Sequence, residues 1–133
     1  MDLHSRATGD GGVIVGLRLS ATEAEHLGED ARRLITLLGR ALWAAEDLRH
    51  GNERAEWWPV LTDVQELRQR LGGIADAALR EIPDASHGEV SAVLGESRAT
   101  IAYRRQRGLL PPTVPTPYEE WARTGTLPSS TDH

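Results

Sequence analysis

One long apolar stripe at helical spacing limits the folds that this chain can adopt. Ser20 and Glu23 have the spacing of a capping box and predict that a helix begins there. Apolar residues then recur every three or four positions, at Leu27, Ala31, Leu34, Ile35, Leu38, Ala41, Leu42, Ala45 and Leu48. With Gly51 ending it, the helix would be about 42 Å long. A chain of 133 residues cannot bury such a helix along its whole length, so we expect a homodimer.

A second stripe predicts another helix, over residues 62–82. Its apolar positions are Val64, Leu67, Leu71, Ile74, Ala75, Ala78, Leu79 and Ile82. Gly72 and Gly73 weaken this helix and are candidates for a kink. We interpret Trp57-Trp58-Pro59, ahead of it, as a packing anchor. The β-branched run over 13–19 predicts one short strand, which needs a partner to be stable.

The composition favours a helical core and excludes several classes of protein. Phe is absent, with four Trp and two Tyr, so small aliphatic residues must fill the core, as they do where helices pack on helices. The absence of Cys excludes disulfides and thiolate metal sites. No apolar run approaches the roughly 18 residues of a membrane span. The polar start of the chain lacks a signal-peptide core. We expect a cytoplasmic protein with no membrane contact.

Positive charge is concentrated in one short segment. The net charge is −5, which is unusual for a protein whose whole surface meets nucleic acid. All 15 basic residues are arginine, a bias that we attribute to a GC-rich bacterial genome. Residues 98–107 nevertheless contain four arginines and no acidic residue. A local basic patch is therefore expected at this segment.

Residues 87–107 have the sequence form of a helix-turn-helix. A short apolar helix leads to Gly95, and Ser97 can then cap a second, polar helix. The first residues of such a second helix reach base edges, which suggests Arg98 and Thr100 for that role. We expect phosphate contacts from Ser97, Tyr103, Arg104, Arg105 and Arg107. The alternative is a structural αα-hairpin with a charged outer face.

The same segment carries a longer pattern that needs no gap. It comprises Gly88-Glu89-Val90, Gly95, Ser97, Thr100, Tyr103 and Arg107-Gly108-Leu109-Leu110-Pro111-Pro112. Residues 88–112 thereby resemble the DNA-binding segment of the MerR family, which implies a helix-turn-helix that binds double-stranded DNA. Ala99 and Ala102 stand where that family has arginines, and Arg104 stands where it has a second tyrosine. No wing is evident after the proline pair.

Metal and catalytic sites find little support in the sequence. Two pairs, Glu23 with His26 and Asp47 with His50, have the i, i+3 spacing of metal ligands. They lie about 240° apart around one predicted helix and cannot meet within one chain. The chain has no phosphate-binding glycine loop and no nucleophile motif. We therefore expect no cofactor and no enzymatic activity.

These observations predict a mainly α fold: a helical bundle with a C-terminal helix-turn-helix and one short N-terminal β-strand. The expected regions are a disordered 1–12, a dimerisation region 13–50, a linker 51–61, a DNA-binding domain 62–112, and a short helix with a disordered tail 113–133. The predicted function is sequence-specific binding of double-stranded DNA by a dimeric transcriptional regulator. The alternative is an adaptor, antitoxin-like or anti-factor protein that binds a protein partner through the acidic N-terminal helix.

Overall fold

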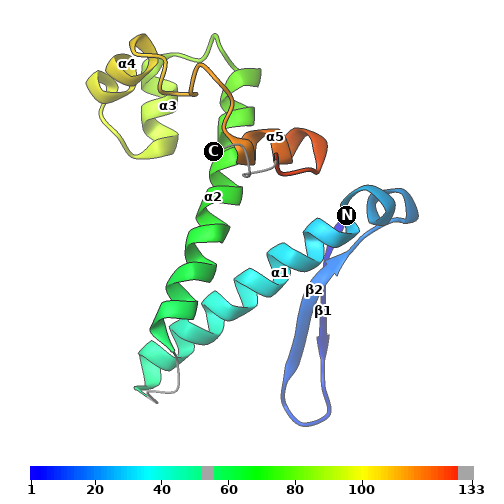
Figure 1. Cartoon of the computed structure of the whole chain (residues 1–133). Helices are drawn as coiled ribbons and strands as arrows, with labels where there is room; N and C mark the ends of the chain where they lie inside the picture. The colour runs from blue at the N-terminus through cyan, green and yellow to red at the C-terminus, as the bar shows by residue number, and fades with distance from the viewer. Residues whose placement is uncertain (52–55, 129–133) are drawn as a thin grey trace. The chain divides into compact units, whose positions relative to one another are not determined.

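The computed structural model describes residues 1–51 and 56–128 and is mainly helical, as the sequence predicts (Figure 1). In chain order the elements are β1 (Asp2–Ala7), β2 (Val13–Arg18), α1 (Ala21–His50), α2 (Trp57–Glu81), α3 (His87–Leu94), α4 (Arg98–Gln106) and α5 (Pro117–Thr124). The chain divides into two compact units, Met1–Leu67 and Arg68–His133. Over the two described ranges, no helix combines the length and the apolar character needed to span a bilayer.

The first unit begins with a two-stranded antiparallel ribbon. β1 and β2 pair in one register, from Asp2 opposite Arg18 to Ala7 opposite Val13. The turn between them uses Gly11 at a φ of 87°, a conformation that glycine adopts without strain. The prediction of a single strand is therefore wrong, because a second strand lies within residues 1–12, which we expected to be disordered. β1 has no β-branched residue, so pairing with β2 rather than its own propensity determines its conformation.

Helix α1 begins and ends as its sequence predicts. The Ser20 hydroxyl accepts a hydrogen bond from the Glu23 amide at 3.1 Å, and the Glu23 carboxylate accepts one from the Ser20 amide at 2.9 Å. These two bonds satisfy amides that the first turn leaves without helical partners. At the other end, Gly51 adopts a left-handed conformation at a φ of 63°. The capping box and the C-terminal glycine are both confirmed.

The buried face of α1 differs from its most apolar stripe. Leu37 and Ala44 are buried, whereas Leu38 and Leu42 of the predicted stripe are exposed. Ion pairs link this helix to α2: an Arg33 nitrogen lies 2.9 Å from Glu66, and an Arg40 nitrogen lies 3.1 Å from Asp63. Much of the stripe therefore remains at the surface of the first unit.

Helix α2 begins earlier than the sequence predicts and is not interrupted. It starts at Trp57 and runs through Gly72 and Gly73 to Glu81. Trp57 and Trp58 lie on its first turn and are both exposed, so the expected packing anchor does not form there. Residues 52–55 of the expected linker lie outside the described residues.

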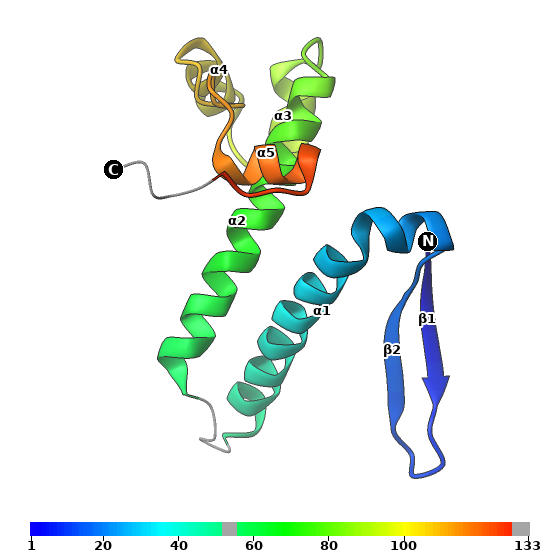
Figure 2. The same ribbon diagram turned by 45° about the vertical axis from the view of Figure 1, so that its right-hand side comes forward.

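In the second unit, Gly73 lets α5 approach α2 closely, and both views show these helices side by side (Figures 1 and 2). A Cβ at position 73 would lie 2.3 Å from the carbonyl oxygen of Tyr118. Trp121 is buried beside this contact, with the guanidinium carbon of Arg70 4.6 Å from a ring centroid. Close packing, rather than a kink, thus accounts for this glycine.

Helix α5 is held by its cap and by one buried carboxylate. Thr116 caps it and Pro117 occupies its first turn, as predicted. Glu119 is fully buried and accepts a hydrogen bond from Arg80 at 2.6 Å. Of the expected disordered tail, residues 129–133 lie outside the described residues.

Candidate nucleic-acid interface

The short helices α3 and α4 pack against each other and are joined by a turn (Figures 1 and 2). Ile101 of α4 is fully buried and Val90 of α3 nearly so, which gives the pair an apolar core. Ser86 and Glu89 form a capping box that starts α3, with bonds of 2.9 and 3.0 Å. Gly95, in a left-handed conformation at a φ of 70°, ends α3 and turns the chain toward α4.

Ser97 starts α4, as the sequence predicts. Its hydroxyl accepts a hydrogen bond from the Thr100 amide at 3.1 Å and lies 2.9 Å from the Thr100 hydroxyl. Ser97 is exposed and Thr100 is half-buried. Both residues stand at the first turn of α4, where their hydroxyls support the helix start.

Arg98 connects the first turns of the two helices. Its side chain is exposed and runs past Gly88, where a Cβ would lie 3.0 Å from the guanidinium carbon. A side chain at position 88 would therefore require the Arg98 guanidinium to shift by a few tenths of an ångström. The Arg98 side chain thus reaches from the first turn of α4 to the first turn of α3.

Arg105 has a packing role that sequence analysis did not anticipate. Its guanidinium donates to the carbonyl of Ala85 at 2.6 Å and to Nδ1 of His87 at 3.2 Å. These bonds fasten α4 to the residues that lead into α3. His87 is a site residue that the sequence prediction missed. Only its position, directly after the Ser86 cap at the start of α3, could have suggested it.

The remaining predicted residues lie toward the end of α4. Arg104 is half-buried and forms a long ion pair of 3.8 Å with Glu96. Tyr103 and Arg107 are exposed, and the guanidinium carbon of Arg107 lies 5.6 Å from the Tyr103 ring centroid. This is within cation–π range. The structure therefore places a tyrosine and an arginine together at the exposed end of the helix.

The positive charge of the arginines in residues 98–107 is only partly neutralised by acidic residues. Among the described residues, no carboxylate pairs with Arg98, Arg105 or Arg107. Residues 98–107 contain no acidic residue. Glu96, in the preceding turn, pairs with Arg104 alone. A chain with a net charge of −5 thus presents a locally electropositive helix.

The chain leaves α4 through a tight turn. Gly108 adopts a φ of 67°, and its carbonyl accepts from the Thr113 amide at 2.8 Å. Arg80 of α2 donates to the carbonyl of Pro112. Between residues 107 and 116 the structure has one isolated bridge, Leu109 with Pro112, and no strand.

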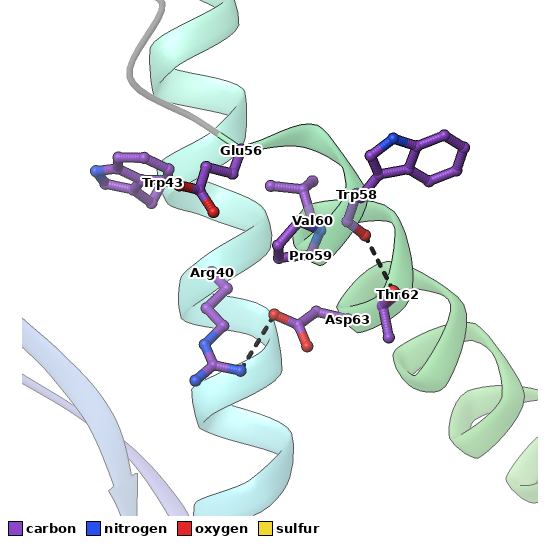
Figure 3. Close-up of a pocket in the computed structure, with 8 residues that line it drawn as sticks. All are labelled: Arg40, Trp43, Glu56, Trp58, Pro59, Val60, Thr62 and Asp63. Atoms are coloured by element: carbon purple, nitrogen blue, oxygen red, sulfur yellow. Dashed lines mark hydrogen bonds and ion pairs between the residues drawn. The ribbon is translucent and has the colours of Figure 1, made fainter.

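A second candidate site is an open groove in the first unit, between α1 and α2 (Figure 3). It has a volume of about 780 Å³ and is lined by Arg40, Trp43, Glu56, Trp58, Pro59, Val60, Thr62 and Asp63. The ion pair of Arg40 with Asp63 crosses from one helix to the other, and the Trp58 indole points away from α1 (Figure 3). Apolar and charged side chains both line the groove, and they do not point toward one common position (Figure 3).

No family model matches the chain, and no curated protein or solved structure matches it significantly. Across the part of the chain that the structure describes, no three His, Asp or Glu side chains gather as metal ligands do. The case for a function therefore rests on the geometry and charge of α3 and α4.

Proposed function

We propose that this chain is a sequence-specific regulator that binds double-stranded DNA through a helix-turn-helix formed by α3 and α4. One observation carries the proposal. Residues 98–107 present four arginines and no acid in an otherwise acidic chain, on a helix packed across a glycine turn from a short apolar helix. Arginine is suited to this role because its planar guanidinium bonds guanine edges and phosphates in bidentate fashion.

The residues divide into two groups by position on α4. Arg98 and Thr100, on the first turn, are the candidates for base edges, and Ser97, at the N-cap, is a candidate for a phosphate. Tyr103, Arg104 and Arg107, on later turns, are the candidates for phosphates. Arg105 belongs to this second group by position, but its bonds to Ala85 and His87 also give it a packing role.

We further propose that the regulator acts as a homodimer, in the cytoplasm, through its first unit. The exposed positions of the α1 stripe, such as Leu38 and Leu42, support this arrangement. A second copy that covers them would bring two helix-turn-helix segments into one assembly. Such dimers read two related half-sites on the duplex.

A second candidate function is protein binding without DNA. The same exposed α1 side chains would also suit a protein partner, as in an antitoxin-like or anti-factor adaptor. Salt dependence separates the two functions. Binding to a duplex weakens steeply as salt rises because counterions are released, and a pure adaptor has no such binding to lose.

The test uses the full chain and a duplex selected from a random library, with binding followed by fluorescence anisotropy. Arg98→Ala should weaken binding to the selected duplex by roughly 1–3 kcal/mol and flatten the preference among duplexes. Arg107→Ala should weaken all duplexes alike and reduce the salt slope by about one. Arg32→Ala is the matched control, because Arg32 is an exposed arginine of α1 in the first unit.

Two results would contradict the proposal. If wild type retains no duplex at low salt, the helix-turn-helix interpretation is wrong and the adaptor function replaces it. If Arg98→Ala and Arg32→Ala bind the selected duplex equally well, Arg98 does not read DNA.

A further inference from the structure

The register of the β-ribbon gives its two faces different chemistry. Directly opposite residues of an antiparallel pair share a face, and successive residues alternate between faces. One face, which we call the apolar face, is made by Leu3 with Leu17, Ser5 with Val15, and Ala7 with Val13. The other is made by Asp2 with Arg18, His4 with Gly16, and Arg6 with Ile14. Every titratable side chain of the ribbon is therefore on one face, and the apolar face has none.

No described part of this chain covers the apolar face. Leu3 is 74% exposed, Val13 62% and Val15 59%. All six residues of β1 are exposed. A two-stranded ribbon is at best marginally stable in water unless one of its faces packs against something. The ribbon therefore needs a cover that the described residues of one chain do not provide.

We propose that the apolar face of the ribbon packs against a second copy of this chain. Around a two-fold axis the same patch of each copy meets, so the patch buries its own charges in the contact. The apolar face has no charge to bury, so two copies of it can meet without leaving a buried charge unpaired. The opposite face would bury Asp2, His4, Arg6 and Arg18. The inference extends the dimer beyond α1 and does not depend on DNA binding.

The exposed area of the first unit is sufficient for such an interface. Besides the ribbon, α1 exposes five large aliphatic side chains: Leu27, Ile35, Leu38, Leu42 and Leu48. Weighted by their exposed fractions, these residues and the apolar face present on the order of 800–900 Å². Each partner in a standard interface contributes about 800 Å².

Two neighbouring residues of β2 provide a matched test. Val15 lies on the apolar face and Ile14 on the opposite face, and both are β-branched and at least 47% exposed. Light scattering after size exclusion should show a dimer for wild type and for Ile14→Asp. Val15→Asp should raise the dimer dissociation constant at least about tenfold, because it buries a charge in the contact. Leu3→Asp, on the other strand of the same face, should behave like Val15→Asp.

Far-UV circular dichroism checks that the helices persist in each variant. A monomeric wild type overturns the inference, and so does an equal mass for Val15→Asp and Ile14→Asp, whether both are dimers or both are monomers. These measurements contain no DNA. A failure of the DNA-binding proposal would instead appear as an intact dimer that retains no duplex.

Discussion

Alanine at Gly73 should destabilise the second unit, whereas alanine at the adjacent Gly72 should stabilise the protein. Both glycines lie inside α2, where alanine is favoured over glycine by about 0.5–1 kcal/mol. A Cβ at Gly72 would meet nothing within 4 Å, so that gain should appear in full. The two variants thus share the same gain in helix propensity and differ only in what the new methyl group touches.

At Gly73 the methyl group has no room. It would lie 2.3 Å from the carbonyl oxygen of Tyr118 and 2.8 Å from the amide nitrogen of Glu119. Backbone atoms of α5 would have to retreat by roughly 1 Å to restore ordinary contacts. That retreat would loosen Trp121, which is 6% exposed, and the buried carboxylate of Glu119. Overpacking of this kind costs about 1–3 kcal/mol, which is the expected difference in stability between the variants.

Urea unfolding followed by circular dichroism and tryptophan fluorescence measures this difference. Gly73→Ala should unfold at lower urea than wild type, and Gly72→Ala at higher urea, with similar slopes. Trp121 is the most deeply buried tryptophan of the described residues, so Gly73→Ala should also alter the native emission spectrum. Equal midpoints for the two variants would refute the reasoning, since they would mean that α5 does not press on α2 at this position.

Three further predictions concern the core, the acid range and the dimer. Ile101→Ala should destabilise the second unit by roughly 2–5 kcal/mol in urea, because this fully buried side chain joins α3 to α4. The hydrogen bond from Arg80 is the main reason that the pKa of Glu119 lies below its ordinary 4.5, so this carboxylate stabilises the fold above pH 4.5 and loses that effect as the pH falls through its folded-state pKa. Acid unfolding of Arg80→Met should therefore depend less on pH than that of wild type. Leu38→Glu should yield monomers in light scattering with the helices intact, and an unchanged dimer mass would count against the α1 interface.

Features encoded by neighbouring residues were predictable from the sequence. The capping box at Ser20, the hydroxyl cap at Ser97 and the Thr116-Pro117 start of α5 all form as expected. Each depends on residues within three positions of one another, so the pattern contains all the information that the bond needs. The two long helices follow from periodicity for the same reason.

Features that depend on distant partners were not predictable. The periodicity of α1 does not tell which side faces α2, because Leu37 and Ala44 are buried while the richer stripe is exposed. β1 lacks strand-forming residues and acquires its conformation from β2. Arg105 bonds a backbone carbonyl 20 residues away, and no sequence pattern distinguishes that role from a phosphate contact.

Because the Arg98 side chain passes Gly88, a substitution at position 88 of α3 would change where this side chain of α4 lies. A methyl group at position 88 would press on the flexible end of the arginine, and its guanidinium would have to shift by a few tenths of an ångström while the fold stays intact. A larger residue at position 88 would therefore favour a shorter or differently directed side chain at position 98. A substitution at position 88, outside α4, could thereby change which groups Arg98 contacts.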